Sequence, residues 1–261
     1  MKISVVGKGG TGKTLVSATL ARLLAQKGKK VVAVDLDSNP NLGFALGLDL
    51  ETMETIIPIV DNEELVAART TIPGMGPGAF KMNPKVSDLV ASFGVPTRDE
   101  VRLLVAGFIV ESEQGCMCGA HALLKALLRH LVKRREDFVV LDVEAGLEVF
   151  GRGTVKHTDF LIVVTDPSFR SLQTVERIAK LAEQEGIPPE KTICVVNKLP
   201  QEGADYQREI VESFPFYLVL EIPILVEVAT ADLSGAPVID YAPNSVFVKK
   251  IDSLTKALMQ A

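Results

Sequence analysis

The feature that most constrains this chain lies close to its N-terminus, where eight consecutive residues read Gly7-Lys8-Gly9-Gly10-Thr11-Gly12-Lys13-Thr14. They match the phosphate-binding loop pattern, and they follow an apolar, β-branched run at Ile3–Val6 and precede a helical pattern. The glycines let successive backbone N–H groups converge on phosphate oxygens, and the N-terminus of the following helix favours anions. The spacing therefore predicts a nucleotide site in which Lys13 contacts the β- and γ-phosphates and the Thr14 hydroxyl binds Mg²⁺.

Apolar runs without polar alternation recur along the chain, as expected for strands that are buried on both faces. After the first run they lie at Val31–Asp35, Val101–Val110, Phe138–Asp142, Phe160–Thr165, Thr192–Asn197 and Phe216–Ile222. Helical patterns separate them: one ends at Gly28, and the others span Gly119–Glu136 and Ser171–Glu185. This alternation predicts an α/β fold, a three-layer P-loop NTPase with a mostly parallel sheet of about seven strands flanked by helices. We expect one domain over residues 1–261, with the Gly- and Pro-rich residues 70–86 as a surface connection.

Composition narrows the possible partners. The 261 residues carry 28 Lys and Arg against 33 Asp and Glu, a formal net charge of −5, which argues against nucleic acid as a partner. The two most apolar stretches, Phe216–Ala229 and Ala120–Val132, are interrupted by charged residues and offer no run of about 18 apolar residues. A secretory signal does not fit, because the glycine-rich motif begins where its apolar region would lie. With three cysteines, the chain is expected to be cytoplasmic and without stable membrane insertion.

Acidic residues stand at the ends of two predicted strands. Asp35 and Asp37 follow one strand and Asp142 ends another, and carboxyl ends of parallel strands share the sheet edge at which the phosphate loop opens. Carboxylates there suit Mg²⁺ and the attacking water. An aspartate at a strand end is also a common helix cap, and this alternative stays open for Asp35.

Lys8 is the second residue of the loop, and with it the loop reads KGGTGKT. This motif resembles that of the deviant Walker A ATPases. The group includes the nitrogenase iron protein, the septum-positioning (MinD) and plasmid-partitioning (ParA) ATPases and metallocentre-assembly proteins. The resemblance implies ATP and ADP as ligands and a homodimer in which Lys8 reaches the partner's nucleotide. It also implies that Asp142 is the Walker B aspartate and that Asp37 orients the hydrolytic water.

Two further roles follow from this resemblance. Asp35 would lie near the metal. In the family, proline directly follows the second aspartate, but here Asp37 is followed by Ser38-Asn39-Pro40. The division of roles between Asp35 and Asp37 therefore stays open. Asn197, at the end of another strand, would contact the adenine edge.

Cys116-Met117-Cys118 distinguishes this chain from those relatives. Two thiols one residue apart can bind one metal ion but cannot complete a four-coordinate site, so a two-fold axis would have to supply the second pair. The alternative is two structural cysteines before a helix. Four thiolates by themselves favour Zn²⁺ or an iron–sulfur cluster over Ni²⁺. Cys194 lies in an apolar run and is predicted to be a core residue.

The position of this cysteine pair, before the helix that leads to Asp142, resembles the CooC-type ATPases that insert nickel into CO dehydrogenase. Their pattern continues similarly over essentially the whole chain, through Asp142-Val143-Glu144-Ala145-Gly146, Arg152-Gly153-Thr154 and Asn83-Pro84-Lys85-Val86. Glu144 departs from it, since a glycine or other small residue is expected there. The resemblance implies a nickel metallochaperone with a client nickel enzyme such as CO dehydrogenase.

Alternatives from other classes remain open. A related chaperone would serve acetyl-CoA synthase, and an iron–sulfur scaffold ATPase could hold a cluster on four thiolates. A nitrogenase-like protein needs a second, well-placed cysteine, and Cys194 does not fit. A MinD- or ParA-like positioning switch would use a membrane or DNA face. The amphipathic C-terminal segment, with Val246, Phe247, Ile251, Leu254 and Leu258, could lie on a membrane, but docking onto the sheet is the commoner fate of such a stripe.

Overall fold

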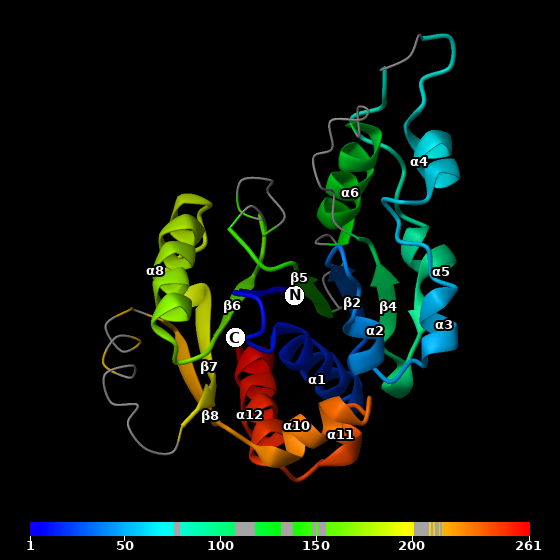
Figure 1. Cartoon of the computed structure of the whole chain (residues 1–261). Helices are drawn as coiled ribbons and strands as arrows, with labels where there is room; N and C mark the ends of the chain where they lie inside the picture. The colour runs from blue at the N-terminus through cyan, green and yellow to red at the C-terminus, as the bar shows by residue number, and fades with distance from the viewer. Residues whose placement is uncertain are drawn as a thin grey trace.

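The computed structural model describes residues 1–75, 79–107, 118–131, 138–147, 150, 155–200, 209, 211, 214 and 216–261. Its centre is an eight-stranded sheet with the order β3-β4-β2-β5-β1-β6-β7-β8 (Figure 1). The strands are β1 (Lys2–Gly7), β2 (Val31–Leu36), β3 (Val95–Pro96), β4 (Arg102–Val105), β5 (Phe138–Val143), β6 (Phe160–Thr165), β7 (Thr192–Leu199) and β8 (Leu218–Pro223). All pairings are parallel except that of β3 with β4.

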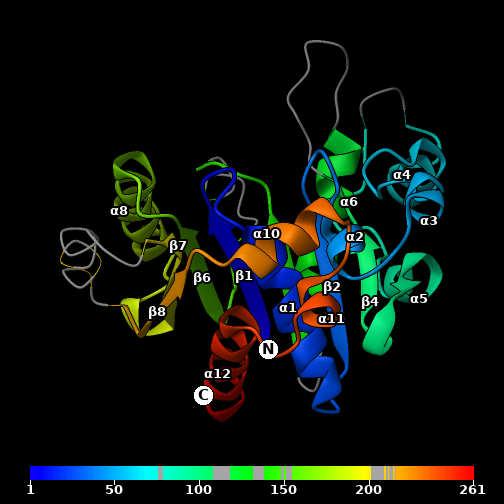
Figure 2. The same cartoon turned by 60° about the horizontal axis from the view of Figure 1, so that its bottom comes forward.

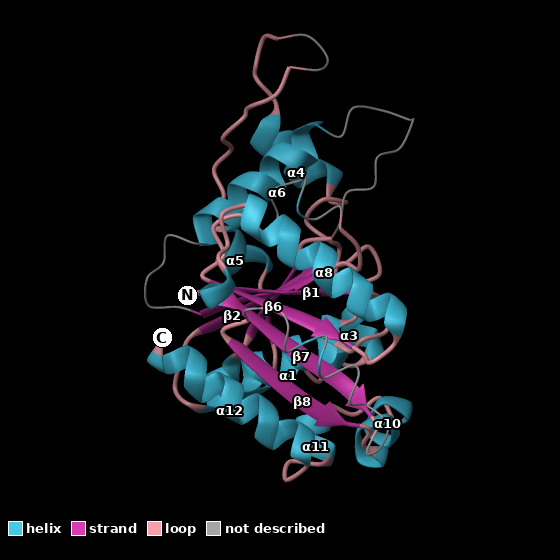
Figure 3. Ribbon diagram, turned by 90° about the vertical axis from the view of Figure 1, so that its left-hand side faces the viewer, coloured by secondary structure: helices cyan, strands magenta, loops and turns pink. Residues whose placement is uncertain are grey.

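Helices lie on both sides of this sheet, which gives the three layers seen edge-on in Figure 3. They are α1 (Lys13–Gln26), α2 (Leu42–Ala45), α3 (Leu50–Glu54), α4 (Glu63–Thr70), α5 (Leu89–Phe93), α6 (Cys118–Leu131), α8 (Phe169–Gln184), α10 (Val226–Leu233), α11 (Val238–Tyr241) and α12 (Val246–Gln260), with short 3₁₀ turns η1 (Arg98–Glu100) and η2 (Pro189–Lys191). Helices α1, α10, α11 and α12 gather on one face, as the tilted view in Figure 2 also shows, and α6 and α8 cover the other.

The strands are buried on both faces because successive side chains enter different cores. In β2, Val31 and Ala33 belong to the core that also contains α1 and α12, whereas Val32 and Val34 belong to the core that also contains α6 and α8. Continuous apolar runs are therefore the expected pattern of these strands, and the mostly parallel α/β fold predicted from the sequence is confirmed.

The structure corrects some predicted boundaries. The two-residue strand β3, which pairs antiparallel with β4, was not predicted, because two residues carry no periodicity. The fourth strand ends at Val105 rather than at residue 110, since Ala106 and Gly107 leave the sheet and residues 108–110 lie outside the described part. Helix α6 is described as far as Leu131, so its predicted end at Glu136 also lies outside.

Glycines end two helices as predicted. Gly28 follows α1 with φ of 77° and Gly186 follows α8 with φ of 79°, both in the left-handed region that favours glycine. Helix α12 docks onto the sheet through its apolar stripe, with Phe247 and Ile251 fully buried. Val246 was predicted to belong to that stripe, but it lies at the first helical position and is 41% exposed.

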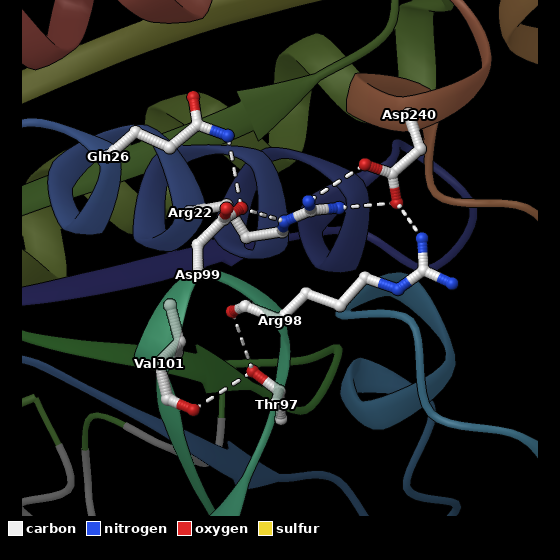
Figure 4. Close-up of polar contacts among 7 residues, drawn as sticks. All are labelled: Arg22, Gln26, Thr97, Arg98, Asp99, Val101 and Asp240. Carbon is white, nitrogen blue, oxygen red and sulfur yellow. Dashed lines mark hydrogen bonds and ion pairs between the residues drawn. The ribbon is translucent and has the colours of Figure 1, made fainter.

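A buried arginine joins three segments that lie far apart in the sequence (Figure 4). Arg22 of α1 donates two hydrogen bonds of 2.8 Å to the carboxylate of Asp240 in α11 and a third of 2.7 Å to Asp99 in η1. Arg98 also donates to Asp240 at 2.8 Å. Because each carboxylate is paired, the guanidinium can be buried without an uncompensated charge, and it fixes α11 and η1 against α1.

Of the predicted surface connection, residues 71–75 and 79–86 are described; they lie between α4 and α5, and most of them are exposed (Figure 1). Thr71 and Phe80 form an antiparallel bridge. Arg69, in the last turn of α4, forms a bidentate ion pair with Asp88, with nitrogen–oxygen distances of 3.1 and 2.6 Å. Among the described residues, no helix has the length and apolar character to cross a membrane.

Candidate nucleotide site

The loop between β1 and α1 has the conformation that its glycines were predicted to allow. Gly7, Gly10 and Gly12 have φ values of 149°, 80° and 98°, which residues with a side chain rarely adopt. Gly12 is the N-cap of α1, and within the described chain no side chain bonds to the first turn, which also contains no acidic residue. The first N–H groups of this 14-residue helix are therefore available to donate hydrogen bonds to an anion bound by the loop.

Residues from the end of β7 support this loop from below. The Asn197 carboxamide nitrogen donates to the carbonyl of Thr11 at 2.8 Å, and the Lys198 ammonium donates to the carbonyl of Gly10 at 2.8 Å. A Cβ atom on Gly12 would lie 2.5 Å from the same Asn197 nitrogen. Asn197 is buried, and through its hydrogen bond to Thr11 it supports the phosphate loop. The predicted contact of Asn197 with adenine stays a prediction.

Two buried carboxylates lie side by side at the carboxyl edge of the sheet, since Asp35 of β2 and Asp142 of β5 are register partners. Burial raises the pKa of Asp142 to about 6, against hydrogen bonds from the Thr14 and Ser17 hydroxyls, which favour its charged form. Ser17 donates to Oδ1 at 3.0 Å. Thr14 and Asp142 are thus brought together at the mouth of the loop, as a shared Mg²⁺ site requires.

Asp35 makes different contacts. Its two oxygens accept main-chain N–H groups, from Asp37 at 3.1 Å and from Leu42 at 2.9 Å. Burial and, after it, the charge of Asp142 raise the pKa of Asp35 to about 7, against the two N–H donors, which lower it. Both oxygens of Asp35 therefore hold the turn after β2, and its place near the metal stays a prediction.

Lys13 and Asp37 make different contacts near the phosphate loop. Lys13 is largely buried, and burial lowers its pKa, against the attraction of nearby carboxylates that include Asp142 and Asp37. Its ammonium lies 3.4 Å from the carbonyl of Lys8, an acceptor that a phosphate oxygen would replace. Asp37 is half-buried, and its Oδ1 accepts the N–H of Asn39 at 2.9 Å in a tight turn.

The cysteine pair is only partly described. Cys118 is the first residue of α6, and Cys116 lies outside the described residues, as does the predicted Arg152-Gly153-Thr154 continuation. No group of three or more His, Cys, Asp or Glu side chains among the described residues could hold a metal ion. The thiolate site stays a prediction, whereas Cys194 is fully buried in β7, as predicted for a core residue.

Sequence reasoning missed three polar residues of the site: Ser17, Lys198 and Ser38. A signal existed for Ser17, which lies three residues after Thr14 and so on the same helix face. None existed for Ser38, whose hydroxyl donates at 2.9 Å to Glu144, 106 residues away.

A parallel sheet with a phosphate loop after its first strand, and with a buried aspartate and a threonine at the loop mouth, defines a P-loop nucleotide-binding protein. Residues 1–185 match the family model described as AAA domain. The chain belongs to this family of P-loop ATPases and is a homologue of the CooC accessory proteins.

Curated relatives match most of the chain. It is 39% identical to an uncharacterized ATP-binding protein of Methanocaldococcus jannaschii over 91% of each chain. It is 38% identical to the carbon monoxide dehydrogenase accessory protein CooC of Rhodospirillum rubrum over 93% of this chain and 91% of that one. The septum site-determining protein MinD of Thermotoga maritima is 26% identical over 97% of this chain and 85% of that one.

Solved structures agree on the fold. The MinC:MinD cell division protein complex of Aquifex aeolicus superimposes with a TM-score of 0.71 over 100% of this chain and 96% of that one, at 20% identity. MinD of Pyrococcus horikoshii complexed with Mg-ADP gives 0.63 over 98% and 95%, at 21% identity. At this level of identity the likeness shows the fold alone.

Proposed function

We propose that this chain is an ATP-hydrolysing, dimeric metallochaperone that aids nickel insertion into CO dehydrogenase or the related acetyl-CoA synthase. The observation that carries the ATPase part is the cluster of Thr14, Ser17 and Asp142 at the mouth of a preformed phosphate loop. The likeness to CooC over most of both chains supports the client enzyme.

The loop residues have the chemistry to bind the triphosphate. The N–H groups of the loop and of the α1 N-terminus would bind phosphate oxygens, and Lys13 would contact the β- and γ-phosphates. Lys8 would reach the nucleotide of the partner subunit, as the resemblance implies. Asp37, at the same mouth, would orient the water that attacks the γ-phosphate.

The hard oxygen donors of the site fit Mg²⁺. The Thr14 hydroxyl and the Asp142 carboxylate are held together by a hydrogen bond and lie at the helix N-terminus where phosphates would bind. When bound there, Mg²⁺ would neutralise charge on the phosphate oxygens. The raised pKa of Asp142 fits this role, because a buried carboxylate without a cation is costly and gains from one.

The cargo site would be formed by Cys116 and Cys118 from both subunits. Four thiolates on one ion at the two-fold axis would couple metal binding to dimerisation. They also suit Zn²⁺, so nickel follows from the family resemblance rather than from the ligands. We propose that hydrolysis alters the segment after Asp142 and thereby the geometry at the cysteines.

The first experiment is metal content per chain together with molar mass in solution, on anaerobically purified protein loaded with Ni²⁺ or Zn²⁺. We expect about one ion per two chains in a dimer. A Cys116→Ala/Cys118→Ala variant should lose the ion, and Cys194→Ala, whose thiol is buried in β7, should keep it. Iron with sulfide would favour the iron–sulfur scaffold, and metal binding that survives loss of both cysteines would overturn the shared site.

The ATPase part is tested by hydrolysis assays with Mg-ATP. Lys13→Ala and Asp37→Ala should each remove most activity, because they delete the phosphate contact and the water-orienting carboxylate. Full activity in either variant would contradict the assignment.

A MinD-like positioning switch is the second candidate, favoured by the shared fold. To act as a MinD-like switch, the chain would have to bind a membrane through its amphipathic C-terminal helix. Its apolar face is already occupied, since Phe247, Ile251 and Leu258 are fully buried against the sheet. We therefore favour the chaperone.

A further inference from the structure

A side chain that the proposed mechanism does not use joins two strand ends at the nucleotide site. Oε1 of Glu144, directly after β5, accepts a hydrogen bond of 2.9 Å from the Ser38 hydroxyl, which follows Asp37. We propose that Glu144 is a positioning residue for ATP hydrolysis that, through Ser38, fixes the turn carrying Asp37. This inference rests on the ATPase activity proposed above.

The turn that carries Asp37 needs a second anchor, because a buried group holds it only where it leaves β2. The N–H of Asp37 donates to buried Asp35 at 3.1 Å, whereas Ser38 and Asn39 are exposed. Exposed loop residues move unless a contact fixes them. The contact between Ser38 and Glu144 supplies a second anchor, on the opposite side of Asp37 from the first.

Glu144 is suited to serve as this anchor. It is half-buried, and it follows β5, whose last residue Val143 pairs with Leu36 at the end of β2. The two strand ends are thus fixed neighbours in the sheet, and the side chain has only to bridge the loops that leave them. A hydrogen bond to a charged acceptor is about twice as strong as a neutral one, which favours Glu over a neutral residue here.

The two carboxylate oxygens of Glu144 differ in their contacts. Oε2 is shielded from solvent and, within the described part of the chain, has no hydrogen-bond partner. Oε1 alone makes the contact with Ser38. A side chain that keeps one acceptor oxygen at this position, such as glutamine, can therefore keep that contact.

The segment that begins at Glu144 lies close to the phosphate loop. Burial lowers the pKa of Lys13, and three carboxylates oppose this shift: Asp142, Asp37 and Glu144. Ala145 approaches the loop as well, since a Cβ atom on Gly9 would lie 3.7 Å from its methyl group. The segment after β5 therefore faces the loop directly, and Glu144 holds the hydrolytic turn at the point where Lys13 would hold the phosphates.

The test is a double-mutant cycle on ATP hydrolysis with Ser38→Ala, Glu144→Ala and the double variant, with ADP affinity and melting temperature as controls. If the pair acts as one unit, each single variant should lower kcat by about tenfold and the double variant by no more. KM and ADP affinity should change by less than about threefold, because the phosphate contacts are intact. Glu144→Gln should restore kcat to within about threefold of wild type, since its carbonyl oxygen can accept from Ser38.

The outcomes separate this inference from the proposed function. If wild-type protein hydrolyses no more ATP than Lys13→Ala, the proposed ATPase fails and the inference fails with it. If wild type is active and the two single effects add up, or Glu144→Gln is as slow as Glu144→Ala, the link through Ser38 is wrong and the ATPase stands. A loss of ADP binding or of folding in the single variants would assign the pair a structural role instead.

Discussion

The carboxamide nitrogen of Asn197 donates a 2.8 Å hydrogen bond to the carbonyl oxygen of Thr11, inside the phosphate loop and 186 residues away. The Lys198 ammonium donates to the carbonyl oxygen of the preceding loop residue, Gly10, at the same distance. The loop that would bind the nucleotide is therefore held in shape by the end of β7 before any phosphate is present. Preorganised donors of this kind avoid the free-energy cost of ordering a loop on binding.

This support makes Gly12 sensitive to substitution. In Gly12→Ala the added methyl would meet the Asn197 nitrogen at 2.5 Å, and φ of 98° would be strained as well. We expect ATP and ADP affinity to fall by tenfold or more, about 1.4 kcal/mol, in a titration with a fluorescent nucleotide. Gly28→Ala is the matched control, because Gly28 has φ of 77° with no described atom within 4 Å of the added methyl. It should lower stability by about 1–2 kcal/mol and leave nucleotide affinity unchanged; equal losses of affinity in both variants would contradict a local effect.

The two buried aspartates should respond oppositely to the same change. Asp142→Asn removes a charge that burial disfavours, so the melting temperature of the nucleotide-free protein should stay or rise, while Mg-dependent hydrolysis falls by about 100-fold. Asp35→Asn places an amide donor against one of two main-chain N–H groups, which costs about 1–3 kcal/mol. Its melting temperature should fall by about 2–4 °C for each kcal/mol. Thermal melts and Mg²⁺ titrations of both variants check this contrast, and equal destabilisation would show that the carboxylates are interchangeable supports.

The two lysines of the loop should separate nucleotide binding from dimerisation. Lys13 lies inside its own phosphate loop and is buried there, so Lys13→Ala should abolish nucleotide binding. Lys8 is half-buried and would act across the dimer, so Lys8→Ala should bind ADP as wild type does and fail to dimerise with a non-hydrolysable ATP analogue. Nucleotide titration and light scattering on the same samples distinguish the two. A Lys8→Ala protein that still dimerises on adding the analogue would exclude contact with the partner's nucleotide.

The Arg22 network should make stability depend on pH in acid. Hydrogen bonds from Arg22 lower the pKa of Asp240, so the folded state binds a proton there less readily than the unfolded state. The stabilisation is complete above the unfolded value of about 3.9 and is lost as the pH falls through the lower folded value. Denaturant melts at several pH values should therefore show Asp240→Asn less stable than wild type at pH 7, with the difference vanishing in strong acid.

A second variant checks the same network from the other side. Arg22→Met should cost about 1–3 kcal/mol, because it removes the shared partner of Asp99 and Asp240 while Gln26 and Arg98 still bond to them. Lys180→Met removes an exposed pair with Glu176 and should change stability by less than about 1 kcal/mol. Similar effects from the two variants would mean that burial of the guanidinium does not matter.

The sequence by itself determined the class of fold and the location of the phosphate-binding loop. The motif from Gly7 to Thr14 encodes a local geometry, because its glycines and its helix N-terminus lie within a few residues of one another. Apolar runs such as Phe138–Asp142 encode burial on both faces, which requires helices on either side. Signals of this kind depend on neighbours in the chain and can be read without the fold.

Only the tertiary structure decided which distant side chains share the site. The sequence did not show that Asp35 accepts two main-chain N–H groups in the turn after β2. The division of roles between Asp35 and Asp37 at the metal stays a prediction. Glu144 was only a departure from a family pattern until the fold placed it against Ser38. The physical reason is the same in both cases: hydrogen bonds across strand ends depend on sheet order and register, and no periodicity along the chain records which strands become neighbours.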